Sequence, residues 1–274
     1  MNKKAIGVFD SGIGGLTVYK ALKEKLPDEK VIYLGDTARL PYGSKSAQTI
    51  IHFSKDNTRF LLSKDIKIIV VACNSASSHA IQHLRDTFEE IPVLGVIEPG
   101  AEAAAEYSKK KIGVIGTSAT IMSRAYEKAI LVKNPNAQFI AKDCPLLVPL
   151  VEEGWLNHKV TKLVVEEYLL PLKEEGIDTL VLGCTHYPVL RGVISEVLGE
   201  DIKLIDSAEV ISKKVHSILK RLGWLNHLKN DCEDEFYVTD FPDRFRKVGE
   251  IFLGRKIEKV TIVDICTMTS TSAA

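Results

Sequence analysis

Short apolar runs alternate with longer amphipathic stretches along most of the chain. The runs have the length of β-strands, and the stretches between them place apolar residues at helical spacing. Strands that alternate with helices are typical of parallel sheets covered by helices on both faces, so the sequence predicts an α/β fold. The expected strands are residues 5–9, 31–34, 66–72, 93–96, 112–115, 138–141, 179–182 and 203–205. The expected helices are residues 16–25, 47–63, 78–88, 101–108, 123–130, 159–175 and 189–198.

The pattern also repeats weakly within the chain. Residues 3–11 resemble residues 109–117, and residues 66–77 resemble residues 177–188, at a nearly constant offset. Four strand positions recur in the same order. The simplest interpretation is a pseudo-symmetric pair of α/β lobes with mostly parallel sheets and the active site in the cleft between them, where ligand sites often lie.

The repeat divides the chain into three parts. The first lobe is expected to span residues 1–97 and the second residues 98–206. Residues 207–274 lack a third copy, and we expect them to pack back on the first lobe. They contain one helical stretch, an acidic turn, two strand-like pieces and a small, polar end expected to fray, at residues 208–222, 231–235, 235–239, 259–265 and 267–274.

Composition and charge exclude several classes of protein. The 274 residues are 45% hydrophobic and 26% charged, as in an ordinary soluble protein, and the formal net charge is zero. A neutral chain argues against nucleic acid as a partner, because such binding needs a basic face. No apolar run approaches the length of a membrane span. Residues 1–4 are basic, but Asp10 interrupts the apolar stretch that follows them, which indicates a first strand and not a signal peptide. We therefore expect a cytoplasmic protein and no membrane partner.

The five cysteines are too few for a disulfide scaffold, and their number is odd. None forms a C-x-x-C pair, so their spacing does not resemble a structural zinc site. Three of them are expected to be buried small hydrophobic residues, namely Cys144, Cys232 and Cys266.

The other two cysteines end equivalent strands. Cys73 is followed by Asn-Ser, and Cys184 by Thr-His. The carboxyl ends of parallel strands are where open α/β sheets place their chemistry, and a helix N-terminus favours a thiolate. Two thiols facing one carbon from opposite sides can remove a proton on one face and return it on the other, which inverts a stereocentre. Zinc held by Cys73, Cys184 and His186 is an alternative, disfavoured by the lack of a local ligand pair.

A glycine-rich turn follows the first strand. Residues 10–15 read Asp-Ser-Gly-Ile-Gly-Gly and precede a helix, which suits an anion. The spacing is neither G-x-G-x-x-G nor a P-loop, and Asp10 would repel a phosphate, so nucleotide binding is the weaker interpretation. Asp10 suits an ammonium group or proton transfer.

Three further loops carry polar groups that either contact a ligand or have a purely structural role. Tyr42 and Gly43 form a turn that is either a tight connection or a ligand contact. Thr117 and Thr120 suit a carboxylate or serve as helix caps. Glu152 either supports the second cysteine or lies in a solvated acidic turn.

Together these segments resemble the glutamate racemases, a branch of the aspartate/glutamate racemase superfamily, over about residues 1–265. Ser75 stands where the family usually has Thr, which keeps the hydroxyl. The segments that carry the resemblance are residues 10–15, 41–43, 71–76, 98–100, 116–120, 182–188 and 205–207.

The resemblance implies racemisation of glutamate by two bases, without pyridoxal phosphate, another cofactor or a metal. Cys73 would take the α-proton of D-glutamate and Cys184 that of L-glutamate. Asp10 is expected to assist Cys73, and Glu152 with His186 to assist Cys184.

The resemblance also implies the binding residues and the setting. Ser11 and the turn at Tyr42 and Gly43 are expected to hold the side-chain carboxylate, with Asp10 and His186 also near the substrate. The family suggests a homodimer that supplies D-glutamate for peptidoglycan. The α-carboxylate is expected to lie among Asn74, Ser75, Thr117, Thr120 and Thr185.

Three other functions stay open at this point. A related enzyme such as aspartate racemase differs in pocket size. A two-lobed binding protein for dicarboxylates would have no use for paired cysteines. A thiol redox protein would need Cys73 and Cys184 close enough to bridge.

Overall fold

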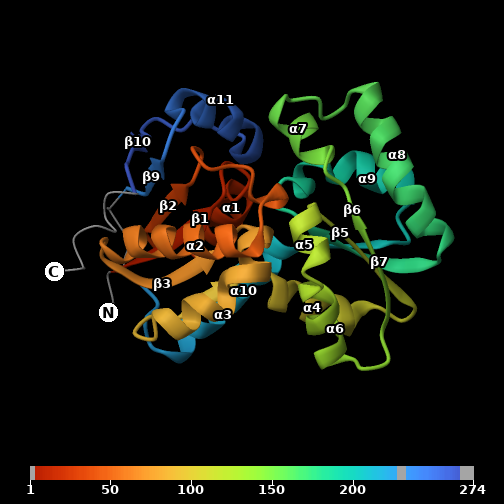
Figure 1. Ribbon diagram of the computed structural model, residues 1–274, viewed down its shortest axis with the longest axis horizontal. Coiled ribbons are helices and arrows are strands. Elements are labelled where there is room, and N and C mark those ends of the chain that lie inside the picture. The colour runs from red at the N-terminus through yellow and green to blue at the C-terminus, as the bar shows by residue number, and fades with distance from the viewer. Residues whose placement is uncertain (1–3, 227–232, 266–274) are drawn as a thin grey trace.

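The computed structural model describes residues 4–226 and 233–265, and it has two parallel sheets flanked by helices. The predicted α/β fold is therefore confirmed (Figure 1). Every strand pairing in the described residues is parallel. Cys232 and Cys266 lie outside the described residues.

The two sheets share one strand order. The first sheet runs β10-β9-β2-β1-β3-β4 and the second β6-β5-β7-β8, so β2-β1-β3-β4 matches β6-β5-β7-β8 position by position. This agreement confirms the pseudo-symmetry that the repeat predicts. The strands are β1 (Ala5–Asp10), β2 (Val31–Gly35), β3 (Ile66–Val71), β4 (Val93–Gly95), β5 (Lys111–Gly116), β6 (Gln138–Asp143), β7 (Ile177–Gly183), β8 (Lys203–Asp206), β9 (Glu235–Val238) and β10 (Thr261–Ile262).

The helices fill the connections between strands. The first lobe and its C-terminal addition contain α1 (Leu16–Lys25), η1 (Tyr42–Ser44), α2 (Ala47–Leu62), α3 (Asn74–Thr87), α10 (Ser207–Arg221) and α11 (Pro242–Leu253). The second lobe contains α4 (Ile97–Tyr107), α5 (Ser118–Met122), α6 (Ala125–Lys133), α7 (Leu147–Glu152), α8 (Lys159–Glu174), η2 (Tyr187–Leu190) and α9 (Arg191–Leu198).

Some elements differ from the prediction. The expected helix at 123–130 is α6, which begins only at Ala125 because Arg124 takes a left-handed conformation with φ of 56°. The short helix α5, Ser118–Met122, precedes it and has no counterpart in the prediction. The expected strand at 259–265 is reduced to Thr261–Ile262. Neither α7 nor α11 was predicted. Each has a proline in its first turns, Pro149 and Pro242, a residue that ordinarily punctuates loops but is tolerated at a helix start.

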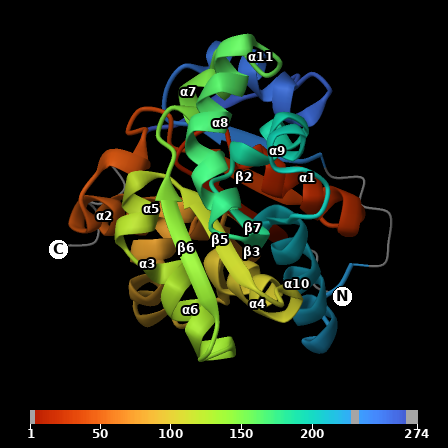
Figure 2. The ribbon, with the colours of Figure 1, turned by 90° about the vertical axis from the view of Figure 1, so that its right-hand side faces the viewer.

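Burial explains why these segments form strands. Every residue of β1 and of β3 is buried, as expected for central strands covered on both faces. In β7, Val181 packs in the core with α4 and α6, whereas its neighbours Leu180 and Leu182 pack in the core with α8 and α9. The sheet therefore has helices on both faces, and Figure 2 shows them around the second sheet.

The C-terminal part of the chain completes the first sheet. β9 pairs with β2, and β10 pairs with β9. α10 packs against α1 of the first lobe and α4 of the second, with Ile211, Val215 and Leu219 buried along one face. We propose that the first lobe comprises residues 1–97 and the second 98–206, with 207–274 packing back on the first lobe.

Among the described residues, no helix is both long enough and apolar enough to cross a bilayer.

Candidate active site

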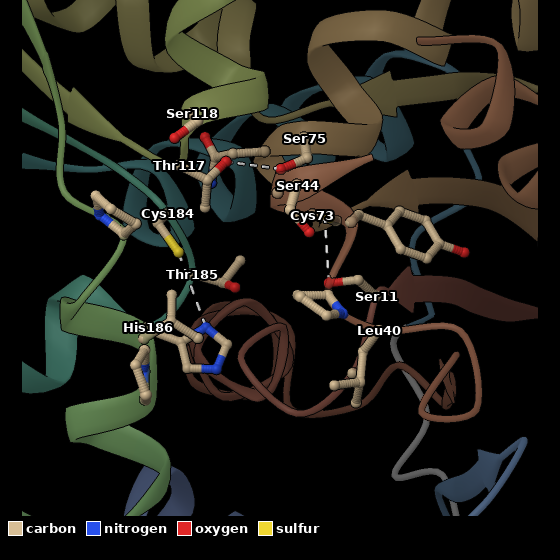
Figure 3. Close-up of a pocket in the computed structure, with 18 of the residues that line it drawn as sticks. Ser11, Leu40, Ser44, Cys73, Ser75, Thr117, Ser118, Cys184, Thr185 and His186 are labelled. Atoms are coloured by element: carbon tan, nitrogen blue, oxygen red, sulfur yellow. Dashed lines mark hydrogen bonds between the residues drawn. The ribbon is translucent and has the colours of Figure 1, made fainter. Parts of the chain in front are cut away.

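A cavity of about 400 Å³ contains both cysteines of the repeated motif. Cys73 directly precedes α3, and Cys184 follows β7, so each thiol lies at the carboxyl end of a central strand. Figure 3 shows Cys184 and His186 on one side of the open space and Cys73 with Ser11 on the other. Both thiols are free and buried. The fold therefore places two thiols on opposite walls of one site.

Cys73 is held by its own lobe. Its Sγ accepts a hydrogen bond from the Ala76 backbone N–H at 3.5 Å, and its thiol donates to Ser11 Oγ at 3.6 Å. Burial, and then the negative charge of Asp10, raise the pKa of Cys73 to about 12, although the hydrogen bonds oppose this. The helix N-terminus alone does not produce a thiolate here. Cys73 is therefore protonated near neutral pH and can act as an acid.

Cys184 belongs to a chain of three polar side chains. Its Sγ lies 3.8 Å from His186 Nδ1, and His186 Nε2 lies 3.1 Å from Glu152 Oε1. Unlike Cys73, Cys184 does not begin an α-helix, because the 3₁₀ turn η2 and its Pro188 come before α9. Glu152 ends α7 instead of lying in an acidic turn. The geometry lets protons move between Cys184 and His186.

The surroundings of His186 favour its charged form. Burial opposes the charge, but hydrogen bonds with Cys184 and Glu152 outweigh burial and raise the pKa of His186 to about 10. For Glu152, burial also opposes the charge, yet His186 and Arg244 keep the pKa of the carboxyl below its ordinary value. His186 and Glu152 are thus an ion pair at neutral pH.

We expect the Glu152→Gln change to lower the pKa of His186 by about one to three pH units, because it removes the charge that faces Nε2. In the unchanged chain the imidazole loses its proton only as the pH rises through about 10, above its ordinary value of 6.5. Histidine side-chain NMR from pH 5 to 11 measures this titration, with a His186→Gln spectrum to assign the signal. An unchanged titration would contradict the ion pair.

Three hydroxyl groups from the two lobes form a cluster. Ser75 Oγ lies 2.9 Å from Thr117 Oγ1 and 3.4 Å from Thr120 Oγ1. Ser75 and Thr117 line the cavity, whereas Thr120 is buried behind them. Thr117 also caps α5 by accepting the Thr120 N–H, as the helix-cap alternative expects. The cluster joins one residue of α3 to two of the second lobe.

Asn74 offers a hydrogen-bond donor to the cavity. Its Oδ1 accepts the Tyr126 hydroxyl at 2.8 Å, which fixes the orientation of the amide. Its Nδ2 is buried, and no partner for it exists among the described residues. A buried donor without a partner is costly, and a carboxylate in the cavity would satisfy it.

The turn after β2 closes the cavity from the first lobe. Gly43 packs against Thr117, and a Cβ on Gly43 would lie 2.7 Å from Thr117 Cβ, so only glycine allows this approach. Tyr42 lines the cavity, but its hydroxyl donates to Asp36 and accepts from Asn57. Its hydroxyl is therefore engaged within the protein, and the backbone of the turn is what remains for a ligand.

Asp10 lies behind the cavity wall. It is fully buried, its Oδ2 accepts the Gly12 N–H at 2.9 Å, and it is not a lining residue. Burial raises its pKa, against the opposing charge of His186 and the N–H groups of Gly12 and Gly15. Its charge acts on Cys73 through the wall, whereas Ser11 and Thr185 line the cavity directly.

Several neighbours of the site have no signal in the sequence. Tyr126 orients Asn74, and Phe252 packs edge-on against His186 with ring centroids 5.4 Å apart. Arg244 reaches Glu152 from α11. These residues are far from their partners in sequence, so no local spacing reveals them. Among the described residues, no group of three or more side chains is arranged to hold a metal ion.

This chain matches one protein family and named relatives over most of its length. The family model for Asp/Glu/Hydantoin racemase matches residues 6–215. A glutamate racemase of Geobacter metallireducens is 49% identical over 263 residues, which cover 96% of this chain and 97% of that protein.

Solved structures show the same similarity. Glutamate racemase isoform RacE1 from Bacillus anthracis superposes with a TM-score of 0.92 at 40% identity, covering 96% of this chain and 98% of that one. The glutamate racemase of Francisella tularensis, solved with D-glutamate, also gives a TM-score of 0.92, at 42% identity, covering 97% of this chain and all of that one.

Proposed function

Since this chain belongs to the Asp/Glu/Hydantoin racemase family and is therefore a racemase, an isomerase, we propose that its substrate is glutamate. The enzyme would interconvert L- and D-glutamate by proton transfer at the α-carbon, with no cofactor. One observation carries this proposal: two buried free thiols face each other across a cavity at equivalent strand ends of two lobes. The relatives that are named glutamate racemases support the assignment of glutamate as the substrate.

The proposed mechanism uses the thiols as acid and base in turn. With L-glutamate, the Cys184 thiolate takes the α-proton, the electron pair stays on the carbon, and the Cys73 thiol delivers a proton to the opposite face. With D-glutamate the roles reverse. The raised pKa of Cys73 leaves it protonated in the free enzyme, which suits the direction that starts from L-glutamate.

Neighbouring groups support each half of the transfer. His186, paired with Glu152, exchanges a proton with Cys184, and Asp10 tunes Cys73 from behind the cavity wall. Charge that develops next to the α-carboxylate needs fixed donors. We propose Asn74 as one of them, together with the hydroxyl groups of Ser75, Thr117 and Thr185, while Thr120 orients the cluster.

We propose that the side-chain carboxylate binds at the first lobe, between Ser11 and the backbone of the turn at Tyr42 and Gly43. The family resemblance further supports a homodimer in the cytoplasm that supplies D-glutamate for peptidoglycan.

Circular dichroism of the purified protein with L-glutamate tests the function. Without added cofactor and with EDTA present, we expect the signal of L-glutamate to decay to zero, and that of L-aspartate to persist. Decay with aspartate alone would reassign the chain to aspartate racemisation. A constant signal with both substrates would contradict racemisation of acidic amino acids.

A further inference from the structure

Helix α11 belongs to the first sheet's side of the molecule, yet it contacts the catalytic pair of the second lobe. Arg244, in its first turn, reaches Glu152 and Glu153 at the end of α7, and Phe252, near the end of α11, packs against His186. Figure 1 shows α11 beside α7 across the two lobes. We propose that α11 is a positioning element for the Cys184 half of the reaction, with Arg244 as its positioning residue; this inference rests on the proposed function.

The contacts form a continuous chain from Arg244 to the thiol. Arg244 Nη2 lies 3.3 Å from Glu152 Oε2, and the other oxygen, Oε1, lies 3.1 Å from His186 Nε2. Each carboxylate oxygen therefore has its own partner, which fixes the rotation of the carboxylate. His186 Nδ1 then lies 3.8 Å from Cys184 Sγ. Arg244 thus holds the group that orients the imidazole.

Two other contacts keep this chain in place. Arg244 Nη2 also lies 3.4 Å from Glu153 Oε1, so the guanidinium joins two consecutive residues at the end of α7. Phe252 is buried, and its ring stands at 86° to the imidazole ring, so it limits the movement of His186. Both contacts come from α11.

The Cys73 half is organised differently. Cys73 bonds with Ser11 and Ala76, and both belong to its own lobe. A change at Arg244 should therefore weaken one base and leave the other intact.

Racemisation rates cannot separate the two bases. L- and D-glutamate have equal free energies, so kcat/KM must be equal in both directions whichever base is impaired. A reaction that needs one base only is required. Elimination from 3-chloroglutamate meets this need: the base takes the α-proton, chloride leaves C3 as the double bond forms, and water then releases ammonia and 2-oxoglutarate.

We expect the Arg244→Gln change to slow elimination from the L-enantiomer by about fivefold, the size expected for a half-exposed ion pair. Elimination from the D-enantiomer should be unchanged, because Cys73 is its base. Arg244→Lys keeps the charge and should restore at least half of the lost rate. Arg246→Gln is the matched control, since Arg246 lies on the same helix and pairs with the exposed Asp243; it should change neither rate.

Equal losses for both enantiomers, or no loss for either, would overturn the role of Arg244 while leaving the proposed function intact. If the unmodified protein neither racemises glutamate nor eliminates chloride from either enantiomer, the proposed function fails, and this inference fails with it. Thermal unfolding of each variant confirms that the fold is retained.

Discussion

Replacing either Cys73 or Cys184 by serine is expected to lower kcat for glutamate racemisation by about a thousandfold. Serine has nearly the same shape, but its hydroxyl is a far weaker acid than a thiol and cannot supply a usable base. Because each turnover needs one group to take the proton and the other to return it, loss of either thiol stops the reaction. Circular dichroism of L- and D-glutamate measures the rates.

The third described thiol provides the control. Cys144 is buried beneath Tyr187, whose hydroxyl donates to the Cys144 carbonyl, and it does not line the cavity. Cys144→Ala should keep kcat within about twofold of the unchanged protein, because the residue is outside the cavity and its thiol donates to the Lys142 carbonyl, at 3.7 Å, and not to a residue of the site. Racemisation at the normal rate by both the Cys73→Ser and Cys184→Ser variants would refute the two-base mechanism.

Elimination from 3-chloroglutamate needs only one base and should therefore distinguish the Cys73→Ser variant from the Cys184→Ser variant. Cys73→Ser is expected to keep elimination from L-3-chloroglutamate and to lose it from the D-enantiomer, and Cys184→Ser should show the reverse. The opposite pattern would exchange the assignment of the two cysteines to the two enantiomers.

The second large effect is expected from Gly14→Ala, which should lower kcat by about a hundredfold. A Cβ on Gly14 would lie 2.3 Å from Thr185 Oγ1 and 2.5 Å from His186 Nδ1. His186 cannot retreat freely, because Phe252 packs against its ring. The imidazole must therefore shift relative to Cys184, and proton transfer depends on that distance.

Gly192→Ala is the matched control, because the residue is inside α9 and a Cβ built there has no atom within 4 Å apart from its chain neighbours and the backbone of its own helix. It should keep full activity and stabilise the helix by up to about 1 kcal/mol. Steady-state racemisation and thermal unfolding measure both variants. Equal activity in the two variants would show that the approach of the Asp10–Gly15 turn to His186 does not set the catalytic geometry.

The sheets could be predicted from the sequence because their strands are buried on both faces. Ile66–Val71 is an almost continuous apolar run, and the polar residues that follow it mark the end of the strand. The positions of Cys73 and Cys184 followed from this pattern, since parallel strands end at one edge of their sheet. The shared strand order followed from the internal repeat.

Other features depend on tertiary contacts that no local pattern reveals. Glu152 and Arg244 are far apart in sequence and meet only because α11 packs across to α7. The hydroxyl of Tyr42 is used by Asp36 and Asn57, which could not be foreseen from the turn alone. The protonation of Cys73 likewise reflects burial beside Asp10, and burial is a property of the whole fold.

The pairing of β9 with β2 has a consequence for the order in which the chain is made. β2 comes from residues 31–35, but the strand that covers its outer edge, Glu235–Val238, leaves the ribosome about two hundred residues later. During synthesis the second lobe therefore emerges while the first sheet still has an open edge of unpaired N–H and C=O groups. Until Glu235–Val238 is made, a nascent chain of this protein must prevent other strands from pairing with that edge.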